Sequence, residues 1–98
     1  MKKDALEKLG YKLITDDFRQ DHSKLISKHY ERVYPGESRD AHIEIDVKTS
    51  LHNGVINADV VGAYYDPYEY GFTPFAFNYD EIKAINQIID ECEKQLRA

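Results

Sequence analysis

The chain has 98 residues and a mass of 11.4 kDa, which is the size of one folded domain and excludes a multidomain enzyme. Apolar residues make up 42% of it, yet no apolar run approaches the roughly 20 residues that a membrane-spanning helix needs. The 13 Lys and Arg residues and 18 Asp and Glu residues give a net charge of −5. This charge argues against binding to nucleic acid or anionic lipid, and it permits a basic partner.

The N-terminal part predicts a short helix over residues 2–9, with Leu6 and Leu9 on one face and Gly10 at its C-terminal end. Residues 11–15 predict a first short strand, and the polar residues 16–23 predict a loop.

Residues 24–34 fit two structures. Ile26, Lys28 and Tyr30 alternate as in a strand, whereas Ile26, Tyr30 and Val33 would also line one face of a helix. Because β-branched and aromatic residues dominate and a Pro-Gly turn signal follows, we expect a strand.

A hairpin over residues 41–65 is the clearest element. Asn53-Gly54 is the preferred pair for a two-residue type I′ turn, and this turn fixes which residues face each other. The facing pairs include Leu51–Ile56, Val47–Val60, Ile43–Tyr64 and Lys48–Asp59. A slip by one residue would place apolar side chains beside polar ones, so turn chemistry, apolar pairing and charge all favour one register.

The C-terminal part predicts a long helix after a segment that mixes aromatic residues with Pro and Gly, of which residues 75–77 form a short strand or extended arm. Asn78 and Glu81 have the spacing of a capping box. One apolar stripe follows, formed by Ile82, Ile85, Ile89, Cys92 and Leu96 and widened by Ile88. We therefore expect one α+β domain over residues 1–98: a short N-terminal helix, an antiparallel sheet of three or four strands, and the long helix on one face of the sheet.

Cys92 is the only cysteine, so the chain cannot form an internal disulfide or a four-cysteine zinc site. It lies on the apolar stripe and is expected to be a core residue. A single cysteine and an N-terminus without an apolar leader are typical of a cytoplasmic protein, which is the localisation we expect.

A candidate metal site lies on the first strand of the hairpin. His42, Glu44 and Asp46 alternate and project from one face, about 7 Å from one to the next. The polar face of any half-buried strand has the same composition, and the sequence places no second histidine beside these residues. His22, His29 and His52 are expected to be surface or turn residues. We therefore expect no metal and no cofactor, and we rank a small metal-dependent hydrolase third among the functions.

No catalytic residue is assigned, because the sequence contains neither a nucleophile elbow nor a phosphate-binding loop. The leading hypothesis is a non-enzymatic protein that binds a protein partner, possibly a basic one, or a second copy of itself. Tyrosines and acidic residues alternate in one segment that would carry the contact: Tyr64, Tyr65, Asp66, Tyr68, Glu69, Tyr70 and Phe72. For any single tyrosine, packing over the sheet or the helix is the simpler interpretation.

The alternative function is an acidic inhibitor that occupies the nucleic-acid-binding site of a host protein. It would need a continuous row of carboxylates, and Lys48 interrupts the row that the hairpin offers.

Two segments, Glu7 to Tyr11 (EKLGY) and Tyr79 to Ile89 (YDEIKAINQII), carry a resemblance. The chain resembles small uncharacterised α+β proteins that phages and mobile elements of Gram-positive bacteria encode, although its Tyr-rich segment departs from their pattern. The resemblance implies the fold and an origin in bacteria or phages, and it implies no activity.

Overall fold

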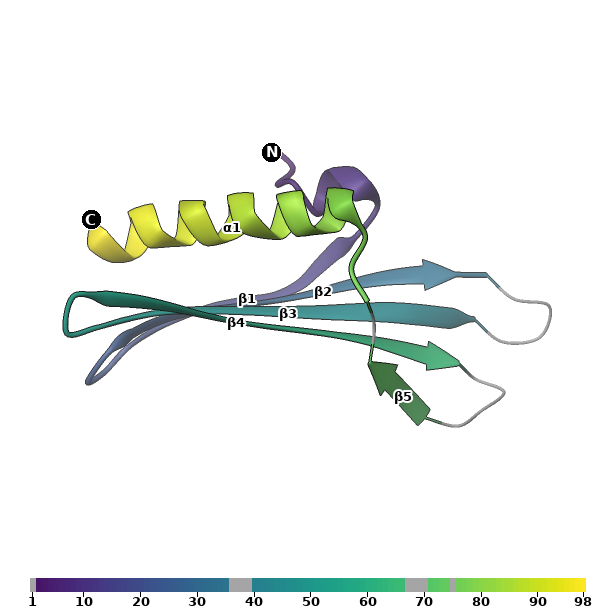
Figure 1. Cartoon of the computed structure of the whole chain (residues 1–98), viewed down its shortest axis with the longest axis horizontal. Helices are drawn as coiled ribbons and strands as arrows, with labels where there is room; N and C mark the ends of the chain where they lie inside the picture. Colours follow the sequence, from purple (N-terminus) through teal and green to yellow (C-terminus); the bar gives the residue numbers. More distant parts are fainter. Residues whose placement is uncertain (1, 36–39, 67–70, 75) are drawn as a thin grey trace.

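The computed structural model describes residues 2–35, 40–66, 71–74 and 76–98. Four long strands follow one another: β1 (Lys12–Gln20), β2 (Lys24–Tyr34), β3 (Ala41–His52) and β4 (Val55–Asp66). A short β5 (Gly71–Pro74) completes an antiparallel sheet in the order β1-β2-β3-β4-β5. The long helix α1 (Tyr79–Arg97) lies across one face of the sheet, as Figure 1 shows. The predicted α+β architecture is confirmed.

The predicted hairpin is confirmed together with its register. Val47 faces Val60 and Lys48 faces Asp59, and the chain turns at Asn53 and Gly54. Both turn residues have positive φ, 50° at Asn53 and 77° at Gly54, as a type I′ turn requires. The strand over residues 24–34 is confirmed as well, with bounds equal to those of β2.

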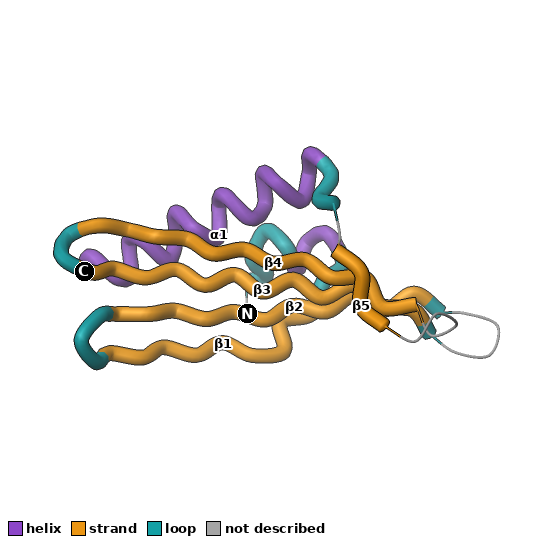
Figure 2. Tube along the Cα trace, turned by 60° about the horizontal axis from the view of Figure 1, so that its bottom comes forward, coloured by secondary structure: helices purple, strands orange, loops and turns teal. Residues whose placement is uncertain are grey.

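The core lies between α1 and the inward face of the central strands. Ile45, Val47 and Tyr30 are fully buried on the sheet side, and they meet Ile88 and Leu96 of α1. Figure 2 looks onto the opposite face, where the strands lie in front and the helix lies behind them. We call this side of the sheet, away from α1, the open face.

The apolar stripe of α1 is rotated from its predicted position. Ile82, predicted to be inside, is 46% exposed, and Ala84 is buried in its place. Glu81 is also buried, and its Oε2 accepts a hydrogen bond of 2.5 Å from the Tyr11 hydroxyl. The capping box of Asn78 and Glu81 is present as predicted.

The helix predicted over residues 2–9 is wrong in length and type. Only a 3-10 helix, η1 (Glu7–Leu9), forms, followed by Gly10 with a φ of 99°. Asp4 and Glu7 cap each other across three residues, which closes one tight turn and leaves too few residues for an α-helix before Gly10.

The loop predicted over residues 16–23 is also wrong, because β1 continues to Gln20. As an edge strand, β1 is exposed along most of its length, and such a strand tolerates polar residues. Asp16 pairs with Lys28 of β2 at 3.2 Å, and Asp17 pairs with Arg19 at 3.0 Å. At the other end of the sheet, β5 comes before the predicted strand at residues 75–77. Residues 76 and 77 belong to no strand, and residue 75 lies outside the described residues.

Candidate functional site

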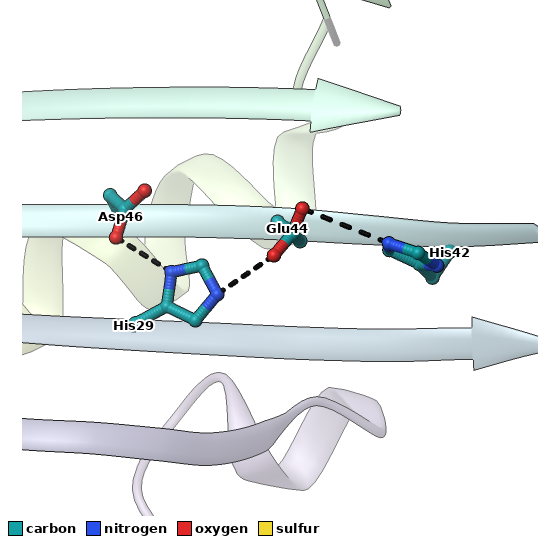
Figure 3. Close-up of polar contacts among 4 residues, drawn as sticks. All are labelled: His29, His42, Glu44 and Asp46. Carbon is teal, nitrogen blue, oxygen red and sulfur yellow. Dashed lines mark hydrogen bonds and ion pairs between the residues drawn. The ribbon is translucent and has the colours of Figure 1, made fainter. Parts of the chain in front are cut away.

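Two histidines and two carboxylates meet on the open face, as Figure 3 shows. His29 of β2 lies directly opposite Asp46 of β3 in the register of these strands. Its Nδ1 lies 2.7 Å from Oδ1 of Asp46, and its Nε2 lies 3.0 Å from Oε1 of Glu44. On the other side of Glu44, Oε2 lies 3.7 Å from Nε2 of His42. We call these four residues the histidine–carboxylate cluster.

The strand pairing explains why the cluster forms. His42, Glu44 and Asp46 alternate along β3 and therefore share one face, as the sequence predicts. The helix takes the other face, so these polar side chains remain on the open face. The His29 and Glu44 side chains are each 24% exposed, which makes the cluster half-buried and still accessible to solvent.

Glu31 adds a third carboxylate beside the cluster. It lies opposite Glu44 across the two strands, and donor atoms of His29, Glu31 and Glu44 lie within 4.8 Å of one another. Two like charges directly opposite each other destabilise a strand pair. A positive charge between these two carboxylates would offset that repulsion.

The protonation of His29 reflects this environment. Burial lowers the pKa of the imidazole, but hydrogen bonds and charges from Asp46 and Glu44 raise it more, so the pKa lies above its ordinary value of 6.5. Because both ring nitrogens face carboxylate oxygens, the imidazolium can donate to Asp46 and Glu44 at once. Asp46 and Glu44 therefore favour the protonated form of His29.

Cys92 is not part of this chemistry. It is buried on the inward side of α1, and burial raises the pKa of its thiol, which disfavours the nucleophilic thiolate. The predicted core role of Cys92 is confirmed.

The expectation that no second histidine accompanies His42, Glu44 and Asp46 is wrong, because His29 lies between the two carboxylates. The signal that would reveal it is the register of β2 against β3. The connection between these strands spans residues 35–40 and has no turn motif of fixed length, so the sequence does not specify that register. His22 and His52 are exposed, the first in the β1–β2 turn and the second at the end of β3, as predicted.

The two described tyrosines of the predicted segment lie on opposite faces of the sheet. Tyr64 is on the inward side and packs against the core, whereas Tyr65 is on the open face and stacks on His42 with 4.9 Å between ring centroids. Asp66 ends β4, and Phe72 of β5 pairs with Tyr65 in the backbone register. Tyr68, Glu69 and Tyr70 lie outside the described residues. Of the described tyrosines in this segment, Tyr65 is the one next to the histidine–carboxylate cluster.

Among the described residues, no helix combines the length and the apolarity needed to cross a bilayer. Comparison with known proteins adds no family to this description: no family model, curated protein or solved structure matches the chain.

Proposed function

We propose that this chain is a small non-enzymatic interaction module that binds a basic segment of a protein partner on its open face. The observation that carries the proposal is the excess of carboxylates on the sheet face opposite α1. Figures 1 and 2 locate α1 and the N-terminal segment on the other side.

The charge of the open face supports a basic partner. Strand register and alternation assign five carboxylates to this face: Asp17, Glu31, Glu44, Asp46 and Asp59. The basic residues assigned to it are Lys12, Arg19 and Lys48; Lys12 lies opposite Glu31, and Arg19 already pairs with Asp17. The five carboxylates still outnumber these three basic residues. An acidic surface of this kind attracts cationic segments and accelerates their association.

Apolar and aromatic groups lie among these carboxylates. Val33, His42 and Tyr65 form a row across β2, β3 and β4, and Val33 is 49% exposed. Val61 lies beside Asp46 and is 55% exposed. Lys and Arg side chains have apolar stems and charged ends, so they can contact the valines while their charges meet the carboxylates. A tyrosine ring adds a cation–π partner at one end of the row.

The test compares two substitutions of the same kind on opposite sides of the molecule. Val61→Lys adds a positive charge to the open face, whereas Ile82→Lys adds one to the exposed side of α1, where Ile82 is 46% exposed. The two chains are used as baits in bacterial lysate, and the affinity of each captured protein is then measured by titration calorimetry. We expect at least a tenfold loss of affinity for Val61→Lys, no loss for Ile82→Lys, and weaker binding as salt is added.

Equal binding by the two variants would contradict the proposal, and so would an affinity that salt does not change. Size-exclusion chromatography of the purified chain distinguishes the remaining case. A dimer that Val61→Lys dissociates would identify the occupant of the open face as a second copy of the chain, and not as a basic partner.

A further inference from the structure

We propose that His29, Glu31 and Glu44 form a binding site for one divalent transition-metal ion of the Zn²⁺ class on the open face. This inference differs from the predicted site in its residues, and it does not depend on the proposed partner binding.

The donor set is suitable for such an ion. One imidazole nitrogen and two carboxylate oxygens are ligands that zinc accepts, and the three donor atoms already lie within 4.8 Å of one another. Zinc holds such ligands at about 2.0–2.2 Å, which places neighbouring donors roughly 3.3 Å apart in a tetrahedral site. Nε2 of His29 and Oε1 of Glu44 are 3.0 Å apart, so this pair needs almost no movement. Rotation of the Glu31 side chain brings in the third donor.

The orientation of His29 is a second argument. A metal-binding histidine commonly donates its other ring N–H to a carboxylate, which fixes the ring and makes the free nitrogen a better ligand. Asp46 does this here: it accepts from Nδ1 at 2.7 Å, and Nε2 then points at Glu44 (Figure 3). Asp46 is outside the proposed ligand set, so it acts as a positioning residue.

The repulsion between Glu31 and Glu44 is a third argument. Each stands on an inner strand of the sheet, and the register holds them face to face. A divalent ion between them converts the repulsion into two favourable contacts. In its absence the imidazolium of His29 supplies a single positive charge to Glu44, and the ion replaces the proton on Nε2 when it binds. Three protein ligands leave a coordination position for water or for a side chain of a partner.

The experiment titrates the untagged, chelator-treated chain with ZnCl₂ at about pH 8, above the ordinary imidazole pKa of about 6.5. We expect one ion per chain by calorimetry and a higher melting temperature in excess zinc, because the ion binds the folded state. In NMR spectra, zinc should shift the ring signals of His29 and leave those of His22 and His52 in place.

The carboxylate variants keep the side-chain shape and remove the charge, and the histidine variants replace the imidazole with a neutral amide. Glu31→Gln and His29→Gln should each weaken zinc binding at least tenfold, whereas Asp59→Asn and His52→Gln, exposed controls that remove one carboxylate and one imidazole, should bind as the original chain does. Circular dichroism checks that each variant is folded. If a His29 variant does not fold, Glu31→Gln and the NMR shifts of the original chain decide the matter.

Two results would overturn the site. One is the lack of a melting shift and of binding heat at millimolar zinc. The other is binding that survives in Glu31→Gln and moves the signals of His22 or His52, which would assign the ion to the exposed histidines.

Discussion

Gly54 shows how much one residue specifies in this fold. It is the second residue of the β3–β4 turn and has a φ of 77°, a conformation in which a side chain strains the backbone. A Cβ atom added at this position would meet no atom within 4 Å. Any cost of Gly54→Ala therefore comes from the backbone, and we expect a loss of about 1–2 kcal/mol in the free energy of unfolding. Urea denaturation, with the slope of the transition unchanged, measures it.

The neighbouring residue supplies the control. Asn53 also has positive φ, but glycine adopts that conformation freely, so Asn53→Gly should change the stability by less than about 0.5 kcal/mol. If the two variants lose equal stability, the turn does not have the type I′ conformation described.

At the scale of the element, α1 offers a direct test of its rotated apolar stripe. Ile88 is 1% exposed and packs in the core, whereas Ile82 is 46% exposed. Ile88→Ala should cost about 2–5 kcal/mol, because it removes buried methyl groups and leaves a cavity. Ile82→Ala should cost less than about 1 kcal/mol, since little apolar surface is lost and alanine favours the helix. Thermal and urea unfolding of the two variants provide the comparison.

The difference between the two isoleucines is the decisive quantity. Both belong to the same predicted stripe and both substitutions remove the same atoms. A larger loss at position 82 than at position 88 would mean that α1 packs in the orientation predicted from the sequence, and that its contact with the sheet is described wrongly.

The elements that the sequence predicts well are those in which several local signals agree. The β3–β4 hairpin combines a turn pair, matching apolar positions and the Lys48–Asp59 pair, and α1 combines a capping box with a continuous apolar stripe. The rotation of α1 does not follow from its own residues, because the buried Glu81 is paired with Tyr11, a residue distant in sequence.

The same reasoning explains why one half of the candidate site could be predicted from the sequence and the other half could not. Residues two apart on one strand share a face, so the alignment of His42, Glu44 and Asp46 follows from the sequence alone. The position of His29 and Glu31 depends on pairing between β2 and β3, whose connection over residues 35–40 has no turn motif that fixes the register. The strand predicted over residues 11–15 is present as the first part of β1, but the rest of this edge strand is missed for another reason: its polar residues meet solvent and resemble a loop.

On the scale of the whole molecule, the N-terminal segment joins the two layers. Leu6 is fully buried between them, and the Tyr11 hydroxyl donates to Glu81 of α1. Tyr30 of β2 donates to Oδ2 of Asp4 at 2.6 Å, and Arg32 donates to the carbonyl oxygen of Leu9 at 2.9 Å. A segment with almost no regular structure therefore closes the end of the core through side-chain hydrogen bonds.

This arrangement predicts unfolding in alkali. Burial and the neighbouring carboxylates Glu81 and Asp4 raise the pKa of Tyr11 and Tyr30 above the ordinary value of 10.0. Both tyrosines keep their protons in the folded state at a pH where the unfolded chain loses them. Their contribution to stability is complete below about pH 10 and decreases above it, by about 1.4 kcal/mol per pH unit for each tyrosine.

Urea unfolding between about pH 9 and pH 12 tests the prediction with two variants, since that range spans the ordinary tyrosine pKa. Tyr30→Phe loses the hydrogen bond to Asp4 and should be about 1–3 kcal/mol less stable at neutral pH, because Oδ2 of Asp4 loses its tyrosine partner. Above pH 10 its stability should fall less steeply with pH than that of the original chain, because only one of the two tyrosines, Tyr11, still contributes to the slope. Tyr79→Phe, which changes a ring that is 73% exposed, should keep the original slope. If Tyr30→Phe retains the full slope, the phenol of Tyr30 titrates normally, and the N-terminal segment does not seal it from solvent.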